Sequence, residues 1–318
     1  HPEYKSGSGI ETTTGPLGQG LGNAVGMAIA EEILKKKYGS SLINNKTYVI
    51  ASDGDLMEGI SHEAMSLAGH LKLKNLIVFF DNNKISIDGS TSLSVSDNYK
   101  KRFEGYGWNF LEINGHNEKQ ISKAITKASK ANKPTLISCK TIIGFGSPNK
   151  SGKASSHGSP LGVEEIALVR KKLKWNNEPF QIPEDILNSW RTIGKKGIKL
   201  EEKWLETLNK KSSHIKSELN KTYVESNLKN LEDLIKEEKV KYFDLKPSMA
   251  TRQCSSAVIE SISSILPQLI GGSADLSGSN NTKTNNSKVI NSKNFDGNYI
   301  HFGVREHGMA AIMNGLAL

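Results

Sequence analysis

Two polar residues in this chain follow apolar runs in the way that ligand-binding residues follow the strands of a parallel sheet. The run at residues 47–51 leads to Asp53, and the run at residues 76–80 leads to Asn83. Two parallel strands joined by a helix would bring both side chains to the same sheet edge. A carboxylate, an amide oxygen and a few main-chain carbonyls suit Mg²⁺, a cation held by few protein ligands and by substrate phosphates. The alternative is ordinary turn chemistry at each residue separately.

A second candidate binding element is a glycine-rich stretch, Gly15-Pro16-Leu17-Gly18-Gln19-Gly20, directly before a helix predicted over residues 21–38. The start of a helix offers unpaired backbone N–H groups to an anion. The dinucleotide-binding fingerprint fails here, because Asn23 stands where the third glycine is needed and no apolar strand precedes it. A nicotinamide enzyme is therefore disfavoured, whereas close helix packing remains another reason for these glycines.

The predicted elements around these residues alternate between strand and helix. Further strands are predicted at 108–113 and 135–141, with a helix over 117–131 between them. Ser61 is predicted to cap the helix that follows Asp53. This alternation indicates an α/β fold, a parallel sheet flanked by helices with ligands beyond the carboxyl ends of its strands.

The pattern changes twice along the chain. Residues 1–160 carry the alternating strands and helices, residues 161–249 are helical and heavily charged, and residues 250–318 begin a second α/β unit. We expect these to be an incomplete domain, a linker and the start of a further domain. The chain begins at His1 without a methionine and stops at Leu318 inside a helical pattern, so we expect a fragment of a longer protein.

The composition of the chain restricts the classes of ligand and the cellular location that we expect. The net charge of +9 favours anionic ligands, but no basic run is interleaved with aromatic residues, so nucleic acid is not expected. Cys139 and Cys254 lie far apart without a metal-type spacing, which indicates free thiols in a reducing compartment. The sequence contains neither a signal peptide nor an apolar run long enough to span a membrane, and we expect a cytoplasmic location.

Two titratable residues stand in places where chemistry is possible. His157 lies in a long glycine-rich loop, residues 142–158, that directly follows a predicted strand, and loops of this kind are often functional. Glu306 opens the last predicted helix, where a carboxylate also stabilises the helix N-terminus without any catalytic role. A histidine in a loop is likewise often an ordinary surface residue.

The ordered motifs of the chain resemble those of thiamine diphosphate enzymes, and more narrowly those of the transketolase family. The wider resemblance is the Asp53-Gly54 turn followed by Asn82-Asn83. The narrower one covers almost the whole chain and consists of the blocks Thr13-Thr14-Gly15-Pro16-Leu17-Gly18-Gln19-Gly20, Glu58-Gly59-Ile60-Ser61, Ser66-Leu67-Ala68-Gly69, Ile85-Ser86-Ile87-Asp88-Gly89, Ile143-Gly144-Phe145-Gly146-Ser147, Ser156-His157-Gly158, Gly271-Gly272-Ser273-Ala274-Asp275-Leu276 and Val304-Arg305-Glu306-His307.

The resemblance implies a cofactor site. Thiamine diphosphate would be bound with Mg²⁺, for which Ca²⁺ or Mn²⁺ could substitute, and the metal ligands would be Asp53, Asn83 and the main-chain carbonyl of Ile85. Gly54 would let the backbone approach the diphosphate, and Gly15, Pro16 and Leu17 would lie against the cofactor rings. The chain departs from the family signature at two positions: Ser52 replaces its first glycine, and Asp55 adds a negative charge near the diphosphate.

The resemblance also implies catalytic and substrate-binding residues. Glu306 would hydrogen-bond the aminopyrimidine ring of the cofactor, and His1 and His157 would contact cofactor and substrate hydroxyls and shuttle protons. Arg252 and Ser279 would bind the phosphate of a sugar phosphate.

The implied reaction moves a two-carbon ketol unit from a ketose phosphate to an aldose phosphate. It would take place in a homodimer whose active sites lie between subunits. Asp275 and Glu58 would belong to the subunit interface.

Two alternatives stay open. A deoxyxylulose-phosphate synthase is a related thiamine enzyme, although the long Gly-Phe-Gly to Ser-His-Gly loop favours transketolase. The chain as it stands could also be a cofactor-binding module without activity, because further histidines and phosphate-binding residues of the family would lie outside it.

Overall fold

The computed structural model describes residues 3–7, 9–223 and 228–318, and its centre is a four-stranded parallel sheet. The strand order is β1 (Thr47–Ala51), β2 (Leu76–Asn82), β6 (Thr135–Lys140) and β5 (Asn109–Asn114). The register pairs Ala51 with Phe80, so β1 and β2 run side by side to the same edge. The predicted parallel α/β sheet is confirmed.

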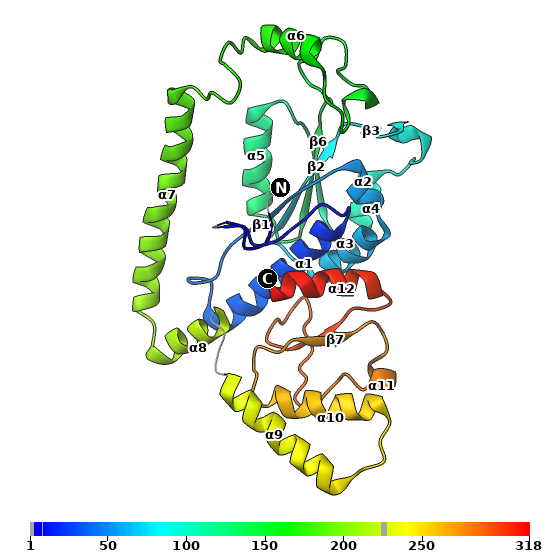
Figure 1. Cartoon of the computed structure of the whole chain (residues 1–318), viewed down its shortest axis with the longest axis vertical. Helices are drawn as coiled ribbons and strands as arrows, with labels where there is room; N and C mark the ends of the chain where they lie inside the picture. Colours follow the sequence, from blue (N-terminus) through cyan, green and yellow to red (C-terminus); the bar gives the residue numbers. More distant parts are fainter. Residues whose placement is uncertain (1–2, 8, 224–227) are drawn as a thin grey trace.

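The sheet is covered on both faces, which explains why β2 is apolar at consecutive positions. Leu76, Val78 and Phe80 pack in the main core with α1 (Gln19–Tyr38) and α3 (Gly59–Leu71). Ile77 points the other way and packs with α5 (Glu118–Ser129). Helices thus flank the sheet on both sides (Figure 1).

The segments that follow β1 and β2 form small elements at the carboxyl edge. They are α2 (Asp53–Met57), β3 (Ile85–Ser86), β4 (Gly89–Ser90), the 3-10 turn η1 (Thr91–Leu93) and α4 (Tyr99–Gly105). The prediction that Ser61 caps a helix is wrong, because α3 begins at Gly59 and the Ser61 hydroxyl instead donates to the main-chain carbonyl of Asp55.

The charged middle of the chain is helical, as predicted. It contains α6 (Val163–Leu173), α7 (Glu184–Asn209), α8 (Ser213–Tyr223) and α9 (Leu228–Leu245). Trp204 fixes α7 to the body by donating from Nε1 to the carbonyl of Leu42, at 2.9 Å, whereas Trp190 in the same helix is 70% exposed. Most of α7 stands away from the sheet (Figure 1). Within the described residues, no helix is both long and apolar enough to cross a membrane.

The last unit contains α10 (Thr251–Ser263), β7 (Gly271–Ser273), α11 (Ser277–Asn280), β8 (Tyr299–His301) and α12 (Glu306–Ala317), with β7 and β8 parallel. Helix α12 packs against α1 through backbone atoms. A Cβ added to Gly26 would lie 2.1 Å from the carbonyl oxygen of Ile312, and one added to Gly315 would lie 1.9 Å from that of Asn23. Small residues at this crossing therefore hold the two units together.

Candidate functional site

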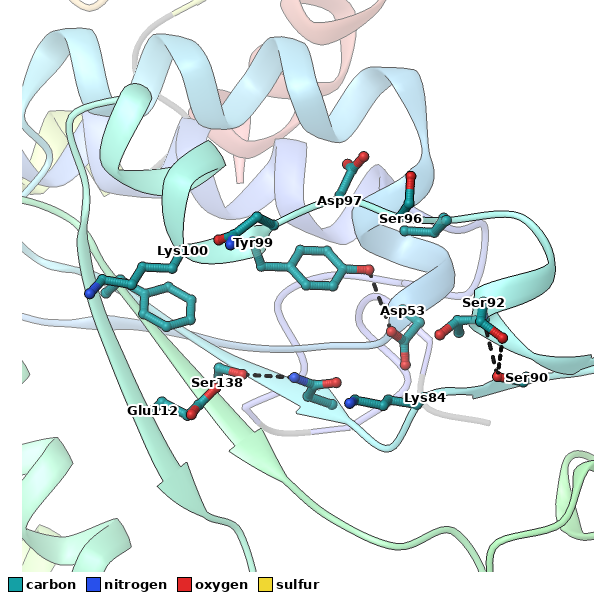
Figure 2. Close-up of a pocket in the computed structure, with 15 residues that line it drawn as sticks. Asp53, Lys84, Ser90, Ser92, Ser96, Asp97, Tyr99, Lys100, Glu112 and Ser138 are labelled. Carbon is teal, nitrogen blue, oxygen red and sulfur yellow. Dashed lines mark hydrogen bonds between the residues drawn. The ribbon is translucent and has the colours of Figure 1, made fainter.

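The carboxylate of Asp53 lies at the end of β1 in the first turn of α2, and its residue is only 3% exposed. The Lys84 amide and the Tyr99 hydroxyl both donate to this carboxylate, the hydroxyl to Oδ1 at 3.5 Å. Oδ2 is buried and has no hydrogen-bond partner. Figure 2 shows the Tyr99 hydroxyl pointing at Asp53, with Lys84 on another side of it. A buried oxygen without a donor is costly and therefore indicates a missing positive partner.

The electrostatics of Asp53 agree with this interpretation. Burial raises the pKa of Asp53 to about 6, and the neighbouring Asp81 carboxylate adds to the rise, although the hydrogen bonds from Lys84 and Tyr99 oppose it. Burial and the Asp53 charge in turn raise the pKa of Tyr99 to about 12, so this residue remains a neutral donor. A bound cation would relieve the cost of the buried charge.

Asn83 lies in the tight turn between β2 and β3, the turn whose Lys84 amide donates to Asp53. Its Nδ2 donates to Asp81 at 3.1 Å, and its Oδ1 accepts the Ile85 amide at 2.9 Å. Lys84, which lies between Asn83 and Ile85 in the chain, has a left-handed backbone conformation with φ 60°, and its amide donates to Asp53. The structure therefore brings the Asp53 and Asn83 turns together, as the strand order requires.

These oxygens fit one kind of metal better than others. Within the described residues, no three His, Cys, Asp or Glu side chains gather as a metal-binding cluster. A site built from one unpartnered carboxylate oxygen, an amide oxygen and main-chain carbonyls matches a hard cation such as Mg²⁺, with phosphate oxygens or water completing its coordination. It does not match the closed nitrogen or sulfur cage of structural zinc.

A cavity of about 730 Å³ opens beside Asp53. Most of the residues that line it are polar, and they come from the segment 82–92, the start of α4 with the loop before it, and strands β5 and β6 (Figure 2). They include Asn82, Lys84, Ser90, Ser92, Asp97, Tyr99, Glu112 and Ser138. Of the expected site residues that the structure describes, only Asp53 lines this cavity.

The glycine-rich stretch reaches the Asp53 turn by a different route. Leu17 lies over Gly54, where an added Cβ would be 3.2 Å from Leu17 Cδ1. The Gly18 amide donates to Asp55 Oδ1 at 3.0 Å. Gly15, Pro16 and Leu17 therefore belong to a loop that meets the Asp53 turn at Leu17 and Gly18.

The sequence did not predict that Tyr99 contacts Asp53, or that Arg102 packs against the Tyr99 ring. Arg102 lies 5.0 Å from the Tyr99 ring centroid and donates to the carbonyl of Leu56 at 3.0 Å and to Asp97 at 2.9 Å. The only signal in the sequence was Asn98, which caps α4 by accepting the Lys101 amide. An asparagine before a short helix indicates a cap and does not reveal that the next residue, Tyr99, donates to Asp53.

His157 is exposed and lies just after a 3-10 turn, η2 (Ala154–Ser156). Its loop is anchored by a second residue that sequence reasoning missed, Glu165 of α6. The Glu165 carboxylate accepts hydrogen bonds from the Ser147 hydroxyl and from the amide and side chain of Asn149, both at 2.8 Å. These hydrogen bonds lower the pKa of Glu165 to about 2, and the bond from Ser147 has the largest effect. The Glu165 carboxylate is therefore ionised at neutral pH.

The other expected residues lie apart from Asp53. Glu306 is exposed at the start of α12 and does not line the cavity, while the next turn of α12 is fixed by the Gly308 amide donating to Glu63 at 2.6 Å. Arg252 and Ser279 are exposed on α10 and α11, neighbouring elements of the last unit. His1 lies outside the described residues. Asp275 and Glu58 are exposed.

Comparison with known proteins places this geometry in a family. Residues 1–228 match the family described as "Transketolase, thiamine diphosphate binding domain", and residues 247–318 match "Transketolase, pyrimidine binding domain". The chain belongs to the transketolase family. The transketolase of Sinorhizobium medicae is 46% identical over 318 residues, and that of Buchnera aphidicola from Acyrthosiphon pisum is 49% identical over 326 residues.

Solved transketolases share the fold. The Campylobacter jejuni enzyme superposes with a TM-score of 0.86 at 38% identity, over 98% of this chain and 47% of that one. A Pichia stipitis transketolase in complex with xylulose 5-phosphate superposes with a TM-score of 0.85 at 36% identity, over 96% of this chain and 47% of that one. The two curated relatives are also matched over the whole of this chain but only 46% and 49% of their own length. The chain thus spans about half of a transketolase.

Proposed function

We propose that this chain serves a transketolase reaction, the transfer of a two-carbon ketol unit from a ketose phosphate to an aldose phosphate. The observation that carries the proposal is the buried, unpartnered Oδ2 of Asp53 beside the Asn83 turn, in a chain of the transketolase family. Structural neighbours that hold xylulose 5-phosphate and fructose 6-phosphate support sugar phosphates as substrates.

In this proposal the cofactor is thiamine diphosphate with Mg²⁺, and bound cofactor supplies the electron sink for breaking the carbon–carbon bond. Asp53, Asn83 and the Ile85 carbonyl hold the metal, Gly54 gives the diphosphate access to the backbone, and Gly15, Pro16 and Leu17 lie against the rings. The support is the buried, unpartnered oxygen of Asp53 beside a turn whose residues can offer amide and main-chain oxygens.

The remaining roles involve the substrate and proton transfer. Glu306 holds a proton shared with the aminopyrimidine nitrogen, and His1 and His157 bind substrate hydroxyls and move protons near neutral pH. Arg252 and Ser279 bind the sugar phosphate. We assign residues 1–160 to the diphosphate-binding domain, 161–249 to the linker and 250–318 to the start of the pyrimidine-binding domain.

Glu306 and Asp53 are proposed to meet across a homodimer. Within one chain Glu306 is exposed and does not line the Asp53 cavity, and α12 is packed against α1 and α3 of the same chain. A partner subunit that brings its own Glu306 to Asp53 would complete the site. We further propose a cytoplasmic enzyme of the pentose phosphate pathway, in keeping with its two free cysteines.

The deciding experiment compares substrates. A coupled assay should show turnover with xylulose 5-phosphate and ribose 5-phosphate, and that turnover should disappear when Mg²⁺ is removed with a chelator. Condensation of pyruvate with glyceraldehyde phosphate, without the first reaction, would identify a deoxyxylulose-phosphate synthase instead.

A cofactor titration separates an enzyme from a binding module. Calorimetry with thiamine diphosphate and Mg²⁺ should show binding by any chain that turns over sugar phosphates. Binding without turnover would identify this chain as an inactive module, and no binding at all would remove the cofactor assignment.

A further inference from the structure

The two positions at which this chain departs from the family signature, Ser52 and Asp55, contact each other directly. Asp55 Oδ2 accepts both the amide and the hydroxyl of Ser52, each at 2.8 Å, and the Ser52 hydroxyl accepts the Asp55 amide at 3.3 Å. This reciprocal arrangement is a capping box at the first turn of α2. The serine and the aspartate therefore act as a pair.

The second oxygen of Asp55 reaches outside that turn. Asp55 Oδ1 accepts the Gly18 amide at 3.0 Å, which connects the turn after β1 to the loop before α1. Gly18 has φ 77°, and a Cβ there would lie 2.6 Å from Ile60 Cγ2 and 2.9 Å from Ser61 Oγ. The backbone of Gly18 is thus held tightly against α3, with its N–H directed at Asp55.

We propose that Ser52, Asp55 and Gly18 form a clasp that sets the position of the Gly15–Leu17 loop relative to the Asp53 carboxylate. The inference rests on the proposed function, in which that loop carries the cofactor rings and Asp53 the metal. Asp55 is a positioning residue: it fixes Ser52 on one side and Gly18 on the other, and Asp53 lies between Ser52 and Asp55 in the chain.

The clasp requires a carboxylate and not merely a polar side chain. Both oxygens of Asp55 face main-chain N–H donors, one from Gly18 and one from Ser52. An amide of the same size has a single acceptor oxygen, so it would direct an N–H at one of these donors. The charge of Asp55, which looked unfavourable next to a diphosphate, is therefore neutralised in part by three donated hydrogen bonds.

The test is a double-mutant cycle read by cofactor binding. Asp55→Asn should weaken thiamine diphosphate binding about tenfold at saturating Mg²⁺, as expected for losing a charge-assisted hydrogen bond. Ser52→Ala, which removes only the hydroxyl, should weaken it by roughly twofold to fivefold. The double variant should lose less affinity than the sum of the two single losses, because the Ser52 hydroxyl and the Asp55 side chain bond to each other.

Two further readouts keep the test decisive. Hydrogen exchange at the Gly18 amide should speed up in Asp55→Asn without any cofactor present, and the Mg²⁺ dependence of binding should be unchanged, since Asp53 is intact. Glu104→Gln, which removes an exposed charge on α4, should alter neither the exchange at Gly18 nor cofactor binding.

If the unaltered protein binds the cofactor and Asp55→Asn binds it equally well, or if the effects of the two substitutions are additive, the clasp is refuted. Failure of the unaltered protein to bind would instead refute the proposed function, and unchanged Gly18 exchange would then refute the clasp separately.

Discussion

Replacing Asp53 with asparagine should stabilise the metal-free chain while it destroys the metal site. Burial raises the pKa of Asp53 from 3.8 to about 6. At about pH 7.5, keeping this carboxylate charged in the folded chain therefore costs about 3 kcal/mol, since one pKa unit corresponds to roughly 1.4 kcal/mol. An amide keeps an acceptor for Lys84 and Tyr99 but leaves its N–H group unpaired at a cost of about 1 kcal/mol. The expected net gain is about 2 kcal/mol.

The pH dependence of this gain follows from the direction of the shift. Because the folded-state pKa of Asp53 is raised, the folded chain binds more protons than the unfolded chain between 3.8 and about 6. The unfavourable contribution therefore grows as the pH rises through this window and is absent below it. At about pH 5 the charge contribution should be roughly half of its value at neutral pH.

The assay is urea unfolding of the unaltered chain and Asp53→Asn, with a chelator present, at several pH values. Asp88→Asn, which removes an exposed charge in the β3–β4 turn, is the control and should change little. Calorimetry should show that Asp53→Asn no longer binds thiamine diphosphate in a Mg²⁺-dependent way. If Asp53→Asn were less stable than the unaltered chain at neutral pH, or if the difference did not vary with pH, the argument from a buried unpaired charge would be wrong.

Three further substitutions test other parts of the structure. Glu165→Gln should make the His157 loop more sensitive to proteolysis at neutral pH. In the unaltered chain, the ionised Glu165 should hold this loop fully above the unfolded-state pKa of 4.5, and its stabilising contribution should be lost as the pH falls toward the folded-state pKa of about 2. Gly26→Ala should lower the free energy of unfolding by about 3 kcal/mol or more, because its Cβ would meet backbone, while Gly59→Ala, with open space around it, should be neutral or slightly stabilising in the same urea titration. Tyr99→Phe should raise the pKa of Asp53 further by removing a donated hydrogen bond, which titration of the metal-free chain by NMR would detect.

The sheet could be predicted because its signals are local. β1, β2, β5 and β6 are short apolar runs that alternate with helices, and this pattern is sufficient to place Asp53 and Asn83 at one edge. The first residue of a helix was harder to predict. Ser61 looks like a helix cap, but α3 already begins at Gly59, and the Ser61 hydroxyl donates to the main-chain carbonyl of Asp55. Boundary signals of this kind compete with tertiary hydrogen bonds, and here the tertiary bond decides.

The site could be predicted only in part because its supports come from distant segments. The family motifs predict Asp53 and Asn83 as site residues, but nothing near Glu165 in the sequence reveals that it anchors a loop starting some twenty residues earlier. The contact between Gly26 and α12 joins residues at opposite ends of the chain. Asp55 illustrates the same limit, because its charge looks out of place until Ser52 and Gly18 are seen to donate to it.

The central claim is that Asp53 of one subunit works with Glu306 of another, and subunit mixing tests it most directly. Asp53→Asn and Glu306→Gln should each be inactive alone in the transketolase assay. When equal amounts are refolded together, half of the dimers should be hybrids with one intact site, so about a quarter of the unaltered activity should return. No recovery from a mixture that is shown to contain hybrid dimers would contradict the shared site.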